Sequence, residues 1–260
     1  MAFDITSIQQ GKRNLPPRIL LLGTPKVGKT EFCCVEDRAT MKCMDDVILL
    51  PIKGEEGSDA LDVGRFPIIQ TFEQIMEAFS VLSMQDHPYS TVVIDSSSAL
   101  EPLVWDKACR ENSWTSIEKP GYGKGYVEAL KYWRQIQECL DYLRNERKMA
   151  CVIIGHVVVK VFNDPMMDPY DQFIWNINSK AVGLFTQWAD CVLFAKHESF
   201  SKIDKDGNSK VRRGTGAGLR KLYTQERPAH PGGGRGIYGR LPYELDLSWT
   251  AFTTAVNATQ

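Results

Sequence analysis

The chain has 260 residues, of which 43% are hydrophobic and 24% are charged, values typical of a soluble globular protein with a sizeable core. Its formal net charge of −1 gives no overall attraction for nucleic acid, so such binding would need a local basic patch. The seven cysteines form no C-x-x-C pair and no apolar run is long enough for export or a membrane span, so we expect no zinc site, no membrane segment and a cytoplasmic location.

Residues 1–17 are polar and end in two prolines, which predicts an extended lead segment. An apolar run from Arg18 to Leu22 then meets the pattern G-x-x-x-x-G-K-T, the phosphate-binding P-loop. Its glycines let successive backbone N–H groups converge on an anion, and the helix expected from Lys29 to Val35 adds its partial positive charge. The predicted phosphate-binding residues are Gly23, Thr24, Pro25, Lys26, Val27, Gly28, Lys29 and Thr30.

Two P-loop side chains have expected roles with a nucleoside triphosphate. Lys29 would reach the β- and γ-phosphates, and the Thr30 hydroxyl would hold Mg²⁺. We therefore expect the chain to bind a nucleoside triphosphate together with Mg²⁺.

Further elements follow in chain order. Continuous apolar runs predict buried strands at 47–52, 91–95 and 150–155. Capping-box spacing at Thr71 predicts a helix start, and apolar residues every three or four positions predict the longest helix between Gly121 and Met149. Later strands are expected at 191–195, 219–224 and 243–247, with a hairpin over 199–211 that turns at Asp206-Gly207-Asn208. We expect one α/β domain over 18–260, with a mainly parallel sheet, flanking helices and an antiparallel C-terminal edge.

Carboxylates at strand ends indicate the chemistry. Asp95 closes the run Val92-Val93-Ile94, where a P-loop fold carries the second acidic residue that holds magnesium. The next residue is Ser96 rather than a water-activating glutamate, so a general base must come from another strand end. Glu55 and Glu56, after the strand at 47–52, are the candidates, and a solvated acidic turn is the alternative. We find neither N-K-x-D nor D-x-x-G in a suitable place, so ATP is favoured over GTP.

The chain resembles the RecA-like ATPases, and more closely the phage-encoded RecA-like ATP-binding proteins of single-strand annealing recombination. The similarity covers nearly the whole chain in order. The landmarks are Leu15–Leu21 into the P-loop, Gly54-Glu55-Glu56-Gly57, Ile94-Asp95-Ser96, Gly121–Tyr126, Ile154-Gly155-His156, Trp188–Phe194 and Leu241-Pro242.

This resemblance implies an ATP-dependent role in DNA recombination or annealing, self-association as a filament or ring, and the cytoplasm of an infected bacterial host. A single-strand binding protein is a partner implied in the same way. His156 falls where the family keeps a γ-phosphate sensor, with a core histidine as the alternative. Family members often carry Lys-x-Arg before the terminal Leu-Pro; here that lysine is missing, and Arg235 or Arg240 would be the group that reaches a neighbour's nucleotide.

Two regions are candidates for single-stranded DNA. Residues 160–180 carry four aromatic side chains, including Trp175, that could stack on bases; a loop folded onto the domain's own surface is the alternative. The expected hairpin and its flanks, about 196–227, are rich in lysine and arginine and could follow a phosphate backbone; the alternative is a solvated edge hairpin. The residues predicted to contact DNA are Arg212, Arg213, Arg220, Lys221 and Trp175.

Two competing functions remain open at this point. A nucleotide kinase would transfer the phosphoryl group to a small acceptor and would not respond to DNA. A scaffold that uses ATP only as an assembly switch would bind ATP with negligible turnover.

Overall fold

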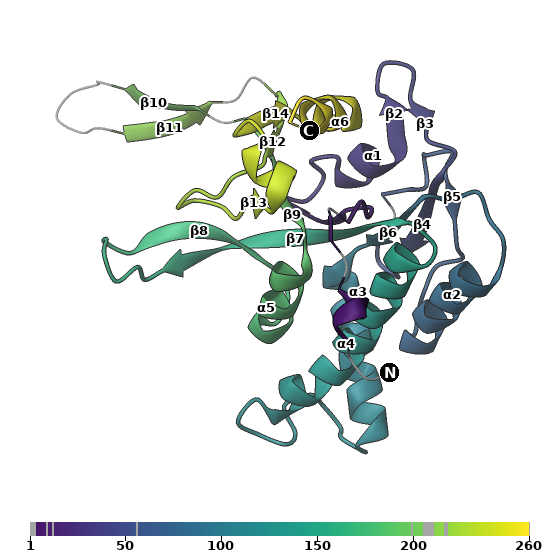
Figure 1. The fold of residues 1–260 in the computed structure, drawn as a ribbon. Coiled ribbons are helices and arrows are strands. Elements are labelled where there is room, and N and C mark those ends of the chain that lie inside the picture. The colour runs from purple at the N-terminus through teal and green to yellow at the C-terminus, as the bar shows by residue number, and fades with distance from the viewer. Residues whose placement is uncertain are drawn as a thin grey trace.

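A ten-stranded mixed sheet lies at the centre of the computed structural model (Figure 1). The structure describes residues 4–8, 10–11, 13–55, 57–198, 200–204, 211–215 and 218–259, with the backbone alone at 200–204 and 211–215. Six neighbouring strands run parallel in the order β9-β1-β7-β6-β4-β5. Their bounds are β1 Arg18–Gly23, β4 Val47–Pro51, β5 Gly64–Arg65, β6 Thr91–Asp95, β7 Ala150–Phe162 and β9 Cys191–His197.

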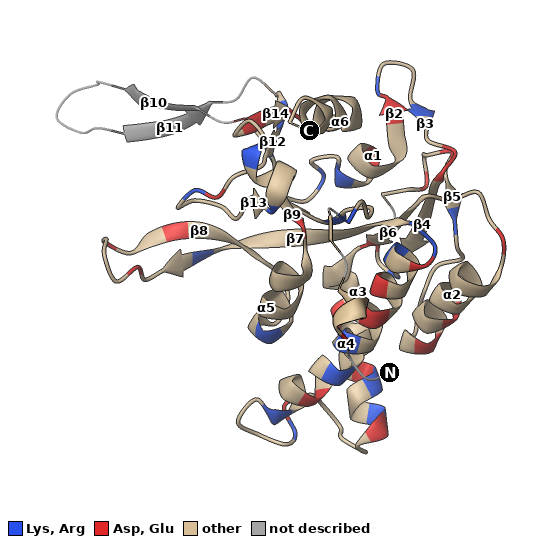
Figure 2. Ribbon diagram, viewed as in Figure 1, with Lys and Arg blue, Asp and Glu red and all other residues tan. Residues whose placement is uncertain are grey.

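Helices cover both faces of this sheet because alternate strand residues point to opposite sides. Leu20 and Leu22 of β1 belong to one buried cluster, together with α2 Phe72–Met84, α3 Ser97–Glu111, α4 Lys124–Asn145 and α5 Ser179–Trp188. Ile19 and Leu21 belong to the other cluster, with α1 Lys29–Cys34 and α6 Trp249–Asn257. The predicted cap of α2 is confirmed, since the Thr71 side chain accepts a hydrogen bond from the Gln74 N–H. Figure 2 shows acidic and basic residues interspersed along α3 and α4.

Short elements complete the layers. The strands β2 Val35–Asp37 and β3 Lys42–Cys43 pair antiparallel directly after α1. A 3₁₀ turn, η1 Ile5–Ser7, lies in the lead segment, and a second, η2 Gly236–Arg240, precedes Leu241. None of the described helices is both long enough and apolar enough to cross a lipid bilayer.

The predicted antiparallel edge of the sheet is confirmed. The hairpin predicted over 199–211 does not form this edge. The strands β12 Arg220–Tyr223, β13 Gly233–Gly234 and β14 Glu244–Asp246 extend the sheet beyond β9. The predicted hairpin is present as β10 Phe200–Asp204 and β11 Val211–Thr215, and these two strands form a separate two-stranded sheet. We call this pair the basic ribbon. Its predicted turn residues lie outside the described part of the chain.

A second hairpin replaces the loop expected at 160–180. Strand β7 continues past the sheet and pairs antiparallel with β8 Tyr170–Trp175, from Val157↔Trp175 to Phe162↔Tyr170. We call residues 157–175 the arm; it projects from the body in Figure 1. Its outer part exposes the apolar side chains of Val159, Val161, Phe162, Met166 and Met167.

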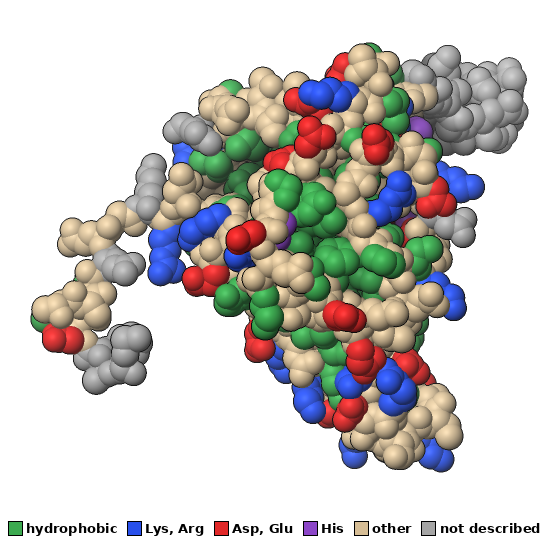
Figure 3. All heavy atoms as spheres, turned by 90° about the vertical axis from the view of Figure 1, so that its right-hand side faces the viewer, with side chains coloured by type: hydrophobic (Ala, Val, Ile, Leu, Met, Phe, Trp, Pro, Cys, Tyr) green, Lys and Arg blue, Asp and Glu red, His purple; other side chains and the backbone are tan. Residues whose placement is uncertain are grey.

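The opposite edge of the sheet, at β5 and α2, carries an apolar groove. Figure 3 looks onto this side of the molecule and shows hydrophobic side chains gathered across it. The groove has a volume of about 230 Å³ and is lined by Phe66, Pro67, Ile68, Ile69, Gln74, Glu77, Ala78 and Val81. Ile68 is 52% exposed there. In Figure 1 the arm points to the left, away from the side of the molecule that carries β5, α2 and this groove.

Candidate functional site

The predicted phosphate-binding residues and strand-end carboxylates meet at one place, the carboxyl edge of the parallel strands. The P-loop connects β1 to α1, and Gly28 takes φ +99°, a left-handed value that favours glycine. The register pairs Gly23 with His156 and Pro51 with Asp95, so β1, β4 and β6 end at this edge, and β7 passes it at His156. A cleft of about 610 Å³ opens here, within the range of small-ligand sites. We call it the P-loop cleft.

Lys29 is buried at the base of the cleft, with 5% of its surface exposed. Its Nζ donates hydrogen bonds to the carbonyl oxygens of Gly23 at 3.2 Å and Thr24 at 3.0 Å, and lies 3.2 Å from His156 Nδ1. Burial lowers the pKa of Lys29 to about 8, partly offset by the charges of Asp95 and Glu55. The ammonium therefore remains mostly protonated at neutral pH, at the position from which a P-loop lysine contacts phosphate.

Thr30 and Asp95, the two residues expected to hold a metal ion, are in direct contact. The Thr30 hydroxyl donates a 2.6 Å hydrogen bond to Asp95 Oδ2, which joins the start of α1 to the end of β6. Asp95 is 4% exposed, and burial raises its pKa, so a cation beside it would relieve the cost of its negative charge. Mg²⁺ prefers hard oxygen ligands of this kind, so these residues fit the ion. When bound with a nucleotide, Mg²⁺ neutralises charge on the phosphate oxygens.

Glu55 follows β4 and faces the same cleft. Its Oε1 accepts a hydrogen bond from the Ser96 hydroxyl and lies 2.8 Å from His156 Nε2, while Oε2 has no hydrogen-bond partner among the described residues. Burial would raise the pKa of Glu55, but the hydrogen bonds from His156 and Ser96 outweigh it and hold the pKa below its usual value. One oxygen of the Glu55 carboxylate is therefore held by Ser96 and His156, and the other can accept a hydrogen bond from a water molecule. The other candidate base, Glu56, lies outside the described residues.

His156 joins Lys29 to Glu55. Lysine can only donate, so Nδ1 accepts from Lys29, and Nε2 then carries the proton that is donated to Glu55 Oε1. The backbone N–H of His156 also donates to the Ser98 hydroxyl, which ties β7 to the start of α3. The ring thus spans the phosphate-binding lysine and the candidate base, and it is not enclosed in the core.

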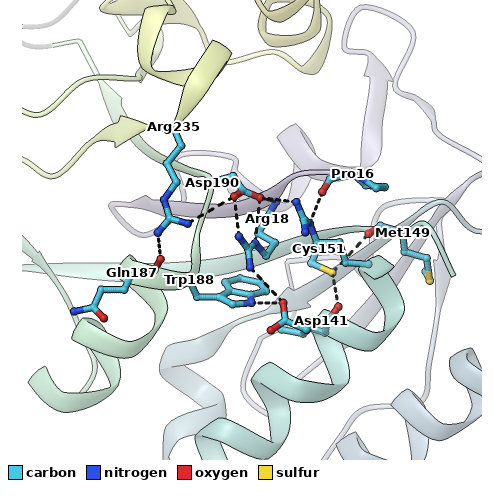
Figure 4. A network of polar contacts seen from close by, with 11 residues as sticks. Pro16, Arg18, Asp141, Met149, Cys151, Gln187, Trp188, Asp190 and Arg235 are labelled. Carbon is cyan, nitrogen blue, oxygen red and sulfur yellow. Dashed lines mark hydrogen bonds and ion pairs between the residues drawn. The ribbon is translucent and has the colours of Figure 1, made fainter. Parts of the chain in front are cut away.

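Arg235 lies away from this cleft, near the amino ends of β1 and β9 (Figure 4). Its guanidinium donates to the Gln187 carbonyl oxygen and lies 4.0 Å from Asp190. Asp190 in turn binds Arg18 at 2.9 Å and Arg144 at 3.4 Å. Arg240, at the end of η2, is exposed. Neither arginine lines its own chain's P-loop cleft.

Three of the residues predicted to contact DNA make contacts within the chain instead. Trp175 is 4% exposed and its indole N–H donates to the Ser97 hydroxyl at 3.0 Å, so its ring is not available to stack on bases. Arg220 points into the P-loop cleft, where it binds Glu31. Lys221 binds Glu244 and Asp246, which neutralise its charge. Arg212 and Arg213 lie on β11, opposite Ile203 and Lys202 of β10.

The residues that support the site from a distance carry little signal in the sequence. Ser96 was noted only because it is not glutamate, yet its hydroxyl holds the candidate base. The contact of Arg220 with Glu31 spans 189 positions, and no local pattern marks it. The run of serines after Asp95 was the one available signal, because strand-end hydroxyls at this edge can bind neighbouring side chains.

Comparison with protein families shows which family the chain matches. A family model described as AAA domain matches residues 15–236, from the lead into β1 to the start of η2. Comparison with curated proteins found no match.

Proposed function

Because the chain belongs to the AAA-domain family of P-loop ATPases, we propose that it is a Mg²⁺-dependent ATPase of the RecA-like type, which acts as a homo-oligomer on single-stranded DNA in recombination or annealing. The observation that supports hydrolysis best is the meeting of Lys29, Thr30, Asp95 and Glu55 in one cleft. These residues come from three different strand ends, so a chance glycine-rich turn does not account for the arrangement.

Each side chain has a defined task in this proposal. Lys29 exchanges its contacts with the Gly23 and Thr24 carbonyl oxygens for the β- and γ-phosphates. Thr30 and Asp95 hold the metal ion. Glu55 Oε2 orients the attacking water and takes its proton, while Ser96 and His156 keep Oε1 in place. His156 responds to the γ-phosphate because Lys29 must leave its Nδ1 to meet that phosphate.

The basic ribbon supports the proposal of a polyanionic partner. The sequence of its strands carries Lys202, Arg212 and Arg213, basic residues of the kind that bind phosphates. Single-stranded DNA supplies closely spaced phosphates, and binding through such a ribbon would weaken steeply with salt. The arm is a poorer candidate because Asp164, Asp168 and Asp171 would repel phosphates.

Two apolar surfaces support self-association. The exposed apolar side chains of the arm lie beyond the part of β7 that belongs to the central sheet, and the groove lies beside β5 at one edge of that sheet. A head-to-tail contact between such surfaces repeats from copy to copy and gives a ring or a filament. In this assembly Arg235 or Arg240 would be the cation offered to a neighbour's cleft; Arg235 is 57% exposed at its side chain.

Steady-state ATP hydrolysis tests the proposal, measured with and without Mg²⁺ and single-stranded DNA at low and moderate salt. We expect Mg²⁺-dependent turnover that single strands stimulate, with stimulation fading as salt rises. Lys29→Ala should abolish ATP binding, whereas Glu55→Gln should keep binding and lose turnover. Tight ATP binding without turnover, with or without DNA, would refute the ATPase proposal and favour the assembly switch. If single-stranded DNA does not change the rate of ATP hydrolysis at low salt, the proposed DNA role is refuted and the ATPase proposal stands.

A further inference from the structure

Arg220 connects the antiparallel edge of the sheet to the P-loop. It is the first residue of β12, which follows the basic ribbon after residues 216–219. Its side chain is only 11% exposed and lines the P-loop cleft together with Glu55. In the sheet, β12 and β4 lie on different sides of β1. The contact therefore joins two parts of the chain that are far apart in sequence.

The guanidinium of Arg220 is held in a fixed orientation. Its two terminal nitrogens donate to the two carboxylate oxygens of Glu31, at 2.7 and 3.0 Å. One of them also donates to the Val27 carbonyl oxygen at 3.3 Å. A Cβ placed on Gly28 would lie 2.1 Å from that same nitrogen, so the guanidinium rests directly against the P-loop backbone.

Glu31 transmits this contact to the residues that bind phosphate. It lies in the first turn of α1, one position after Thr30 and two after Lys29. Paired arginine–carboxylate hydrogen bonds fix direction as well as distance, so the position of β12 and the start of α1 constrain each other. Arg38 also binds Glu31, at 2.7 Å, but its side chain is 58% exposed, so Arg220 is the more enclosed of the two partners.

We propose that Arg220 is a positioning residue of the nucleotide site, which couples nucleotide occupancy of the P-loop to β12 and, through it, to the basic ribbon. This inference rests on the proposed function, since it requires that ATP binds the P-loop. Bound phosphates bring negative charge close to the P-loop backbone at Val27 and Gly28, which the Arg220 guanidinium contacts. Their attraction for the guanidinium competes with that of Glu31, so nucleotide binding changes the strength of the Arg220–Glu31 ion pair. Coupling of this kind is reciprocal: an anion on the ribbon alters ATP affinity as much as ATP alters affinity at the ribbon.

The test compares wild type with Arg220→Gln, Arg220→Lys and Glu31→Gln, using KM and kcat for ATP and hydrogen exchange of residues 211–224 with and without ATP. Arg220→Gln should raise KM about tenfold with kcat changed less than about twofold. Arg220→Lys should recover part of the loss, because an ammonium keeps the charge without the paired geometry. In wild type ATP should slow exchange over 211–224, and this ATP-dependent difference should vanish in Arg220→Gln.

Lys221→Gln is the matched control. Lys221 is the next residue of β12 and also forms ion pairs, but with Glu244 and Asp246 rather than with the P-loop. It should leave KM and the ATP-dependent protection unchanged. Glu31→Gln removes the charge of the other partner in the Arg220–Glu31 ion pair. It replaces Arg220→Gln in the test if that variant does not fold.

The outcomes separate the two proposals. If wild type binds no ATP, the proposed function is wrong. If wild type binds ATP but Arg220→Gln keeps its KM and its ATP-dependent protection, the coupling is refuted while the ATPase stands. The coupling is also refuted if Arg220→Gln speeds hydrogen exchange of residues 211–224 by the same factor with and without ATP. That result would mean that Arg220 only stabilises the local structure.

Discussion

Replacing Asp190 by alanine should destabilise the fold, because its carboxylate joins several residues of the ion network in Figure 4. The Asp190 carboxylate accepts hydrogen bonds from the Arg18 backbone N–H at 3.1 Å and from the Arg18 guanidinium at 2.9 and 3.1 Å. It also binds Arg144 at 3.4 Å. The Arg18 and Arg144 side chains are only 17% and 15% exposed, so both would lose a partner in a poorly solvated place.

The expected loss follows from these contacts. Breaking a buried ion pair by removing one partner costs about 3–5 kcal/mol. Arg18 keeps Asp141 at 3.4 Å, which places the estimate for Asp190→Ala near the lower end, at about 3 kcal/mol. For a domain of this size that is a fall of roughly 6–12 °C in Tm. Urea and thermal unfolding at pH 7 measure it directly.

Arg235→Ala is the control for this experiment. Arg235 touches the same carboxylate at 4.0 Å but is 57% exposed, so its removal should cost less than about 1 kcal/mol. Burial would raise the pKa of Asp190, but its bonds to Arg18 hold the pKa below the ordinary value. The stabilisation is therefore present above the unfolded pKa of about 4 and is lost as pH falls through the lower folded value. Equal losses in the two variants at pH 7 would show that this reasoning is wrong.

Three further predictions concern the cleft and one buried acid. Glu55→Gln should lower kcat at least about 100-fold, measured by single-turnover hydrolysis, because the variant lacks the base. ATP affinity, measured by nucleotide titration, should stay within about threefold of wild type. Unchanged turnover would show that Glu55 is not the base. His156→Ala should lower kcat by about tenfold or more, and His156→Gln should recover part of it because an amide can also bridge Lys29 and Glu55; equal kcat in both variants and wild type would contradict the bridging role. Burial raises the pKa of Glu101 to about 7, so its contribution to stability is present below about pH 4.5 and is lost as pH rises through 7. Glu101→Gln should therefore gain roughly 1–3 kcal/mol relative to wild type at pH 8 and little at pH 4; urea unfolding that shows the same difference at both values would refute this assignment.

Local patterns predicted much of the fold and the centre of the site. The P-loop, the strand that ends at Asp95 and the helix capped by Thr71 each carry their signal within a few neighbouring residues. The family match and the sheet confirm the α/β P-loop architecture at that level. That Glu55 and Asp95 face one cleft followed from the rule that neighbouring parallel strands end at one edge.

Features set by distant contacts could not be predicted in this way. Helix α3 was missed, because Pro102 lies within it and proline usually argues against a helix interior. The sequence predicts a loop where β8 forms, because its pairing with β7 and the burial of Trp175 depend on partners far along the chain. The local density of basic residues predicts a DNA contact for Arg220, whereas the structure pairs its side chain with Glu31.

The continuity of β7 has a mechanical consequence. The same strand carries His156 at the cleft and then runs on without a break to Phe162 in the arm. Six residues of extended chain span roughly 20 Å, and a hydrogen-bonded pair of strands bends less readily than a loop of that length. A small tilt of the backbone at His156 would therefore sweep the far end of the arm through a proportionally larger arc. A fluorescent probe at the exposed Met166 would therefore report changes at the phosphate site as movement of the arm.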